Sequence, residues 1–172
     1  MIRRIEHREF QQAEKLLVEV KESLNAHQWN RDYPSKMVLQ SDLETGSLFG
    51  WFEAERLFAM VTLTKQQTGT VKQFNWQEAK SPVFIQRVMT SPLKRGQGLA
   101  LRLLKFAEDE AMAAQCDALC SVTGVNNKAM RHLFDKRGFK KVAAGSVPER
   151  YPYHEFLAFQ KEIGGPCGIL LE

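Results

Sequence analysis

The sequence lacks the features by which membrane, secreted and zinc-binding proteins are usually recognised. No apolar run approaches the length of a membrane span, which argues against a transmembrane role. The opening MIRRIEHREF has neither the apolar stretch nor the small-residue cleavage site of a signal peptide. The three cysteines, Cys116, Cys120 and Cys167, cannot all pair, and no Cys-x-x-Cys motif or nearby histidine gives zinc spacing. We therefore expect a cytoplasmic protein with free thiols, no metal ion and no membrane partner.

An excess of one charge is also lacking. The 24 lysines and arginines exceed the 20 aspartates and glutamates by four, for a net charge of +4. This balance suits a small polyanionic ligand, but the basic residues are scattered among acids and form no aromatic–basic surface motif, so we expect no nucleic-acid partner. With 172 residues, 44% of them apolar, the chain is long enough for one soluble domain with a sizeable core.

Hydrophobic periodicity predicts a single domain of α/β (α+β) class. The predicted elements of the first half are a short opening strand, a helix over 8–26, a helix from the N-cap Ser35 through Leu43 that Gly46 ends, strands over 48–54 and 56–64 that form a hairpin, and an irregular segment over 66–81. Those of the second half are a strand over 83–90, a helix over 97–115, a strand over 118–123, a helix over 126–138, and strands over 139–145 and 154–163. Strand–helix–strand units are parallel whereas the hairpin is antiparallel, so we expect a mixed sheet flanked by helices. We assign residues 1–162 to this domain and 163–172 to a C-terminal tail.

The segment SPLKRGQGLALRLLKFAEDEA, residues 91–111, places two glycines at the start of a strongly helical stretch. Glycine weakens a helix, so Gly96 and Gly98 need another reason to be there. The first turn of a helix has unpaired N–H groups and the positive end of the helix dipole, and glycines let a phosphate approach both. With Lys94 and Arg95 as further donors, the pattern indicates a cradle for a pyrophosphate. The alternative is a turn that needs glycine for its own backbone angles.

Two familiar nucleotide cradles do not fit this segment. A P-loop needs Lys-Ser or Lys-Thr after its last glycine, where this chain has Leu99 and Ala100. A dinucleotide-binding fingerprint needs an acid at the end of the next strand, whereas Asp117 precedes that strand. Neither class of site is therefore expected.

The run from Arg95 to Ala100 matches the pattern Gln/Arg-x-x-Gly-x-Gly/Ala of the GCN5-related N-acetyltransferase (GNAT) family. A second segment, Asn127 to Phe139, resembles the family's later motif, in which an asparagine opens a helix that ends in Gly-Phe. The spacing between the motifs and the opening IRRIEHREFQQAEKLL resemble the family as well, and QWNRDYPS is similar to a subgroup of uncharacterised acetyltransferases. The resemblance extends over about residues 1–162 and implies the GNAT fold, in which two parallel strands splay apart.

The resemblance implies acetyl-coenzyme A (acetyl-CoA) as co-substrate and no metal. The pyrophosphate would lie on the backbone N–H groups of the glycine motif, those of Arg95, Gly96, Gln97, Gly98, Leu99 and Ala100. The pantetheine arm would lie between the strands over 83–90 and 118–123, with backbone contacts from Val88, Met89 and Thr90. Asn127 fits a polar contact to this arm and is equally well explained as a helix N-cap. Phe134 fits packing against the arm or against the core.

The implied reaction is direct attack of a primary amine on the thioester. An amine with a pKa near 10.4 is only about one part in 10³ neutral at pH 7, so a base is useful. Many family members place a tyrosine acid in the later motif where this chain has Phe134, which cannot donate a proton. The candidates for a base are Asp32, Tyr33, Glu149, Tyr151, His154 and Glu155, those for an acid are Tyr151, Tyr153, His132 and Cys120, and those for walls of an acceptor pocket are Trp29, Tyr33 and Trp76.

The function that these features predict is N-acetyl transfer from acetyl-CoA to a primary amine of a small molecule or peptide. The alternative is a GNAT-like module that binds coenzyme A without catalysis, as a sensor or regulator, and the missing tyrosine favours it. Dimers formed through the C-terminal strands are common in the family, so the resemblance also makes a homodimer a candidate assembly. The acceptor is not specified by the sequence because variable loops determine it.

Overall fold

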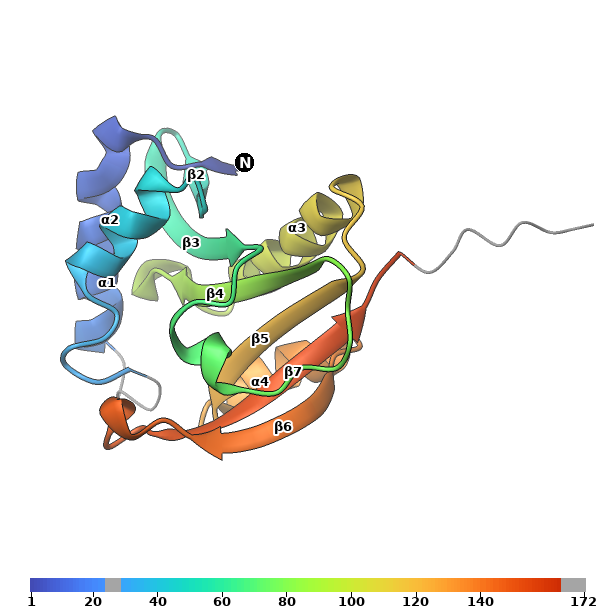
Figure 1. Ribbon diagram of the computed structural model, residues 1–172. Helices are drawn as coiled ribbons and strands as arrows, with labels where there is room; N and C mark the ends of the chain where they lie inside the picture. The colour runs from blue at the N-terminus through green and yellow to red at the C-terminus, as the bar shows by residue number, and fades with distance from the viewer. Residues whose placement is uncertain (24–28, 165–172) are drawn as a thin grey trace, which may run out of the picture.

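The computed structural model describes residues 1–23 and 29–164, and it places their strands in one seven-stranded sheet of order β1-β2-β3-β4-β5-β7-β6 (Figure 1). The strands are β1 (Ile2–Arg4), β2 (Leu48–Glu53), β3 (Arg56–Thr64), β4 (Pro82–Thr90), β5 (Ala118–Gly124), β6 (Lys140–Ser146) and β7 (Glu155–Glu162). β4 and β5 run parallel, and the other neighbouring strands run antiparallel. The predicted mixed α/β sheet is confirmed.

Helices cover both faces of this sheet (Figure 1). They are α1 (Phe10–Ser23), α2 (Lys36–Glu44), α3 (Leu99–Ala113) and α4 (Lys128–Lys136), with 3₁₀ turns at His7–Glu9, Gly69–Gln73, Pro92–Lys94 and Pro148–Arg150. Leu16, Leu39 and Met60 belong to the core under α1 and α2. Leu104 and Leu119 belong to a second core under α3 and α4. No helix among the described residues is long and apolar enough to cross a membrane.

Capping residues and glycines define the helix ends. The Ser35 Oγ accepts a hydrogen bond from the Val38 N–H at 3.3 Å, which confirms the predicted N-cap of α2. α3 begins at Leu99 rather than at residue 97 because Gly98 has a φ of +78°, outside the right-handed helical region. α4 ends before Gly138, whose φ is +81°. The predicted first helix is α1, and its predicted end at residue 26 lies outside the described residues.

The connection between β3 and β4 and the end of the domain also follow the expected pattern. Residues 66–81 are irregular apart from one 3₁₀ turn. Phe74 is buried there, and the half-buried Trp76 donates from Nε1 to the Val71 carbonyl at 2.9 Å. Ile163, the first residue of the predicted tail, is buried, and its N–H donates to the Asp117 carbonyl at 3.0 Å. Residues 165–172, which include Cys167, lie outside the described residues, so the domain boundary stays a prediction.

The parallel strands β4 and β5 separate part-way along their length. Their pairing runs from Pro82–Ala118 to Ile85–Ser121 and stops there, although β4 continues to Thr90 and β5 to Gly124. The Ser121 Oγ donates to the Ile85 carbonyl at 2.7 Å at the point of separation. Beyond that point β4 stays paired with β3, and β5 stays paired with β7. The predicted splay is confirmed, and it leaves one edge of each strand unpaired.

Glu9 forms an ion pair with Arg3, and we expect the contribution of this ion pair to folding stability to depend on pH. The Arg3 guanidinium donates to both Glu9 carboxylate oxygens, at 2.7 and 2.8 Å, and these bonds lower the pKa of Glu9. A carboxyl whose folded pKa is depressed stabilises the fold above its unfolded pKa and loses that contribution as the pH falls through the folded pKa. We expect Glu9→Gln to lower the free energy of unfolding by about 1 kcal/mol at pH 7 and by nothing measurable at pH 2. Urea denaturation at both pH values measures the difference, and Glu78→Gln, at an exposed position away from Arg3, serves as a control that should have no effect at either pH.

Candidate active site

The segment before α3 forms an open nest of backbone N–H groups. Gly96 and Gly98 have φ values of +75° and +78°, and a Cβ built on either would meet no atom within 4 Å. Gly98 offers no side-chain cap, and across residues 1–23 and 29–164 the N–H groups of Gly96, Gly98, Leu99 and Ala100 have no hydrogen-bond acceptor. The Gln97 N–H makes one long bond, 3.4 Å, to the Lys94 carbonyl. The backbone therefore requires the glycines for its own angles, and its N–H groups remain open to an anion, so the pyrophosphate cradle stays a prediction.

The basic side chains beside this nest are held elsewhere. The Lys94 Nζ pairs with Glu53 Oε2 at 2.7 Å and lies 4.8 Å from the centre of the Phe58 ring. The Arg95 Nη2 donates to the Ser23 Oγ at 2.6 Å. Both side chains thus have partners on other elements, a carboxylate for Lys94 and a hydroxyl for Arg95, and their contribution of donors to the cradle stays a prediction. The donors that remain open in this segment are the N–H groups of its backbone.

The splayed ends of β4 and β5 contain buried hydroxyls without partners. The Oγ1 atoms of Thr90 and Thr123 are buried and have no hydrogen-bond partner among the described residues. Val88 is half-buried, whereas Met89 is fully buried in the core that contacts α1. Because a buried polar atom without a partner is costly, two of them beside an unpaired strand edge indicate a place for a polar ligand.

The later motif provides a helix cap and a core residue. The Asn127 Oδ1 accepts from the Met130 N–H at 3.1 Å, so its explanation as an N-cap is confirmed. Phe134 is fully buried, with its ring centre 5.0 Å from that of Phe139 and 5.0 Å from that of Phe159. Phe134 therefore packs in the core, and contacts of Asn127 and Phe134 with a cofactor stay predictions.

Two loops that carry the predicted catalytic candidates lie side by side. The Asn30 Nδ2 donates to the carbonyls of Glu149 and Tyr151, at 3.0 and 3.3 Å. This contact brings Asp32, in the loop between α1 and α2, near the segment between β6 and β7. Residues more than 100 positions apart in sequence thus meet at one edge of the molecule, the acceptor edge, named for a role that stays a prediction.

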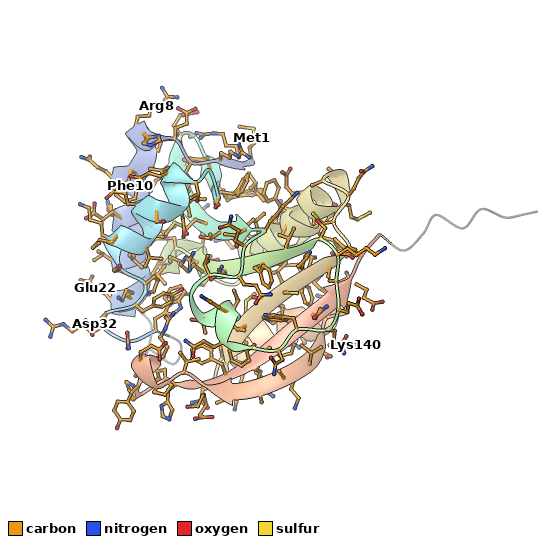
Figure 2. The ribbon with its side chains drawn as sticks, in the orientation of Figure 1. Met1, Arg8, Phe10, Glu22, Asp32 and Lys140 are labelled. Carbon is orange, nitrogen blue, oxygen red and sulfur yellow. The ribbon has the colours of Figure 1, made fainter. Side chains whose placement is uncertain are left out.

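Within that edge, the four principal candidates are exposed or tied to neighbours. Asp32 is exposed and lies at the periphery of the molecule (Figure 2). Tyr151 is 72% exposed and stacks on His154, whose Nδ1 lies 3.1 Å from the Pro152 carbonyl. Hydrogen bonds from its own backbone N–H and from the Gln73 Nε2 lower the pKa of Glu149, which makes it a weaker base. These residues remain candidates for catalysis.

Among the other candidates, His132 is exposed on α4 and Trp29 is buried in the core under α1 and α2. Cys120 is fully buried, and burial together with the Asp117 carboxylate raises the pKa of its thiol to about 12. The thiol that leaves from a thioester has a pKa near 8.5. Because the Cys120 thiol is a much weaker acid than that, Cys120 is a poor proton donor to the leaving thiolate. Among the described residues, no group of three or more His, Cys, Asp or Glu side chains is arranged to hold a metal ion.

The raised pKa of Cys120 leads to a direct labelling prediction. At pH 8 about one molecule in 10⁴ would carry the Cys120 thiolate, and the side chain is closed to solvent. We expect iodoacetamide to leave Cys120 unmodified in the folded protein. It should modify Cys120 in about 8 M urea, a concentration that unfolds most domains. Peptide mass spectrometry measures both. Equal labelling rates in the two conditions would contradict the burial of this thiol.

A buried polar network that sequence reasoning misses lies beneath the acceptor edge. Arg87, at an irregular point of β4 with a φ of +53°, is 9% exposed. Its Nε and Nη2 each donate to the Asp42 carboxylate at 2.7 Å, and its Nη1 donates to the Tyr33 Oη at 2.8 Å. The Thr62 hydroxyl donates to Asp42 at 2.7 Å. The Arg150 guanidinium lies over the Tyr33 ring, 2.9 Å from its centre.

A signal for this network exists in the sequence. Asp42 falls on the apolar stripe of α2 between Leu39 and Leu43, and Arg87 interrupts an apolar strand. Opposite charges at two core positions are typical of a buried ion pair. No comparable pattern identifies Arg150, which lies in a short turn.

A cavity of about 670 Å³ opens beside the network, between α2, the end of β3 and the β3–β4 connection. Tyr33, Asp42 and Arg87 form its inner wall, and Arg4 and Lys65 contribute to the rest of its lining. Tyr33 thus lines a cavity, and that this cavity is the acceptor pocket stays a prediction. Trp76 lines a different and smaller one, of about 320 Å³, together with Cys120.

Comparison with known proteins gives a family and a fold. The model of the acetyltransferase (GNAT) family matches residues 4–139. No curated protein matches the chain. A GNAT-family acetyltransferase of Streptococcus agalactiae 2603 is similar in structure, with a TM-score of 0.77 at 18% identity over 96% of both chains.

Two further solved structures give the same result. Ribosomal-protein-alanine N-acetyltransferase of Brucella melitensis has a TM-score of 0.74 at 15% identity, over 95% of this chain and 99% of its own. The protein yncA of Salmonella typhimurium, solved with its cofactor acetyl-CoA, has a TM-score of 0.72 at 15% identity, over 96% of this chain and 94% of its own. At these identities the structural likeness shows the fold alone. Because the family model matches most of the chain, the protein belongs to the GNAT acetyltransferase family.

Proposed function

We propose that this acetyltransferase moves the acetyl group of acetyl-CoA to the primary amine of a small molecule or a peptide. The observation that carries the proposal is a pair of adjoining features in one stretch of chain. β4 loses its pairing with β5 after Ile85, and the segment that follows it presents the open N–H groups of Gly96, Gly98, Leu99 and Ala100. An unpaired strand edge can pair with an extended amide-containing arm, and the N–H nest suits its pyrophosphate.

The residues present fit such a ligand. The nest offers N–H donors from Arg95 to Ala100, and no side chain fills the space at its two glycines. The edge of β4 offers the backbone of Val88, Met89 and Thr90, and the buried Thr90 and Thr123 hydroxyls there lack partners. Acetyl-CoA, when bound, would supply an activated acyl thioester. The chain's part is to hold it, polarise its carbonyl through N–H groups of β4, and remove water from its surroundings.

The acceptor amine must lose a proton to attack. An alkyl amine near pKa 10.4 is mostly protonated at pH 7, which costs roughly 4 kcal/mol. Asp32, Tyr151, His154 and, with a lowered pKa, Glu149 are the groups proposed to accept this proton. They lie on the paired loops around Asn30 rather than in the core, so they meet a ligand at the surface of the acceptor edge. The name of the Brucella relative, which acts on a ribosomal protein, supports keeping a peptide among the acceptors.

The second candidate function is a coenzyme A-binding module without catalysis. The observation that favours it is Phe134, fully buried where many family members have a tyrosine acid. Isothermal titration calorimetry with acetyl-CoA tests binding, and release of free thiol in the presence of a panel of amines tests transfer. We expect both binding and release. Binding without release from any amine would support the module, and no binding would contradict both functions. A cytoplasmic location and a homodimer stay predictions.

A further inference from the structure

Resting on the proposed function, we infer the class of the acceptor: its molecule carries an oxyanion, a carboxylate or a phosphate, beside the amine, and Arg150 with Gln86 binds that oxyanion. The two residues lie on opposite sides of the acceptor edge, one in the turn between β6 and β7 and the other on β4 where it leaves β5.

The first argument is an unbalanced buried charge. Arg87 and Arg150 are only 9% and 6% exposed, and both contact Tyr33. Asp42 neutralises Arg87, whereas across residues 1–23 and 29–164 no carboxylate forms an ion pair with Arg150. The neighbouring Glu149 carboxylate accepts instead from the Gln73 Nε2 at 2.6 Å. A buried cation without a counter-ion is costly, so an anionic ligand would fill an existing need.

The second argument is a set of donors without acceptors. Gln86 is 6% exposed, and its Oε1 accepts from the Arg87 Nη1 at 3.2 Å. Its Nε2 is buried and has no acceptor in the described part of the chain. The Arg150 Nη2 donates to the Thr70 hydroxyl, and the rest of its guanidinium lies against Tyr33. The unused N–H donors of the Gln86 Nε2, near this buried positive charge, are suited to an oxygen of a carboxylate or phosphate.

The third argument is access. Tyr33, Arg87 and Gly69 line the cavity of about 670 Å³, and a Cβ built on Gly69 would lie 3.8 Å from the Gln86 Oε1. Thr70, the partner of Arg150, follows Gly69 directly. The cavity lining also contains the basic Arg4 and Lys65 and the acidic Glu110, and its Asp42 is paired with Arg87, so a small excess of positive charge favours entry of an anion. An acceptor whose oxyanion is held here would have its amine near the point where β4 and β5 separate.

The test uses pairs of acceptors that differ in charge. The pairs are amino acids with their carboxamides, and phosphoethanolamine with ethanolamine. In one of these two kinds of pair, we expect kcat/KM for thiol release to be at least about 10-fold higher with the anionic acceptor than with the neutral one. A factor of this size corresponds to about one charge-assisted hydrogen bond. Calorimetry with the N-acetylated form of each acceptor, in the presence of coenzyme A, needs no turnover and should show the same preference. A preference for the amino acid over its carboxamide identifies the oxyanion as a carboxylate, and a preference for phosphoethanolamine over ethanolamine identifies it as a phosphate.

Two variants separate recognition from a structural role. Arg150→Gln removes the cation, and Gln86→Glu places a carboxylate of the same shape beside Arg87, which shares its contact with Tyr33 with Arg150. Both should reduce the preference to within about 2-fold, Gln86→Glu without loss of thermal stability, because the new charge replaces the missing counter-ion. The matched control is Arg31→Gln, an exposed arginine of the loop that contains Tyr33, which should leave the preference unchanged.

The outcomes distinguish this inference from the proposed function. Transfer to neutral and anionic amines alike, with equal binding of their acetylated forms, overturns the inference and leaves the function standing. A preference that survives both variants also overturns it. If no thiol is released, the binding preference of the acetylated forms still decides the inference. Destabilisation by Arg150→Gln together with an unchanged preference in Gln86→Glu would show that Arg150 only joins the two loops.

Discussion

Replacing Asp42 with alanine is expected to lower the free energy of unfolding by about 3–5 kcal/mol, the range found when one partner of a buried ion pair is removed. The substitution would leave the Arg87 guanidinium buried without the carboxylate that accepts from its Nε and Nη2. The Thr62 hydroxyl would lose its acceptor as well. Urea denaturation followed by circular dichroism measures the loss.

The double variant Asp42→Leu/Arg87→Met provides the control. Removing both charges replaces the ion pair with apolar side chains of similar size, and such replacements are often neutral or stabilising. We therefore expect the double variant to regain most of the stability that the single variant loses. If it is as unstable as Asp42→Ala, the loss reflects packing between α2 and the sheet rather than an uncompensated charge.

The fold could be predicted from the sequence because its signals are local. Apolar spacing identified α1 and α3. The caps and stop residues Ser35, Asn127 and Gly138 identified α2 and α4 and placed their ends to within about two residues, the usual precision of such boundaries. The change from hairpin pattern to alternating strands and helices predicted a mixed sheet, as the parallel pair β4–β5 shows. The start of α3 was predicted less accurately. Because Gly98 has a φ of +78°, α3 begins after residue 97, and hydrophobic spacing does not reveal a left-handed residue.

The candidate site was predicted where it depends on a backbone motif and missed where it depends on long-range contacts. The N–H nest follows from two glycines at a helix start, so sequence was sufficient. The contact between Lys94 and Glu53 was missed because the two residues are 41 positions apart. Arg87 and Arg150 could not be joined to Tyr33 from sequence, since their three segments meet only when the sheet forms. Side-chain networks between distant elements need coordinates.

Gly98 gives the sharpest test of the nest, because aspartate and asparagine have the same shape and both tolerate a left-handed φ better than other residues. A Cβ at this position meets no atom within 4 Å, so either side chain fits without a clash. We expect Gly98→Asp to weaken acetyl-CoA binding about 100-fold or more, since a carboxylate would stand within a few ångströms of the pyrophosphate. Gly98→Asn should weaken it about 10-fold or less, because it adds bulk but no charge. Calorimetry measures both affinities.

Weaker binding by the Gly98 variants could instead result from backbone strain alone, and variants of Gly138 measure the effect of such strain separately. This glycine has a φ of +81° at the end of α4, and a Cβ there would meet only the Lys161 side chain, at 3.9 Å. Gly138→Asp and Gly138→Asn impose the same left-handed strain away from the nest, so they should lower thermal stability by similar amounts and leave acetyl-CoA affinity unchanged. A large difference between Gly98→Asp and Gly98→Asn, absent at Gly138, can come only from charge repulsion at the nest. Equal affinities of the two Gly98 variants would place the pyrophosphate elsewhere, and the proposed binding mode would have to be abandoned with it.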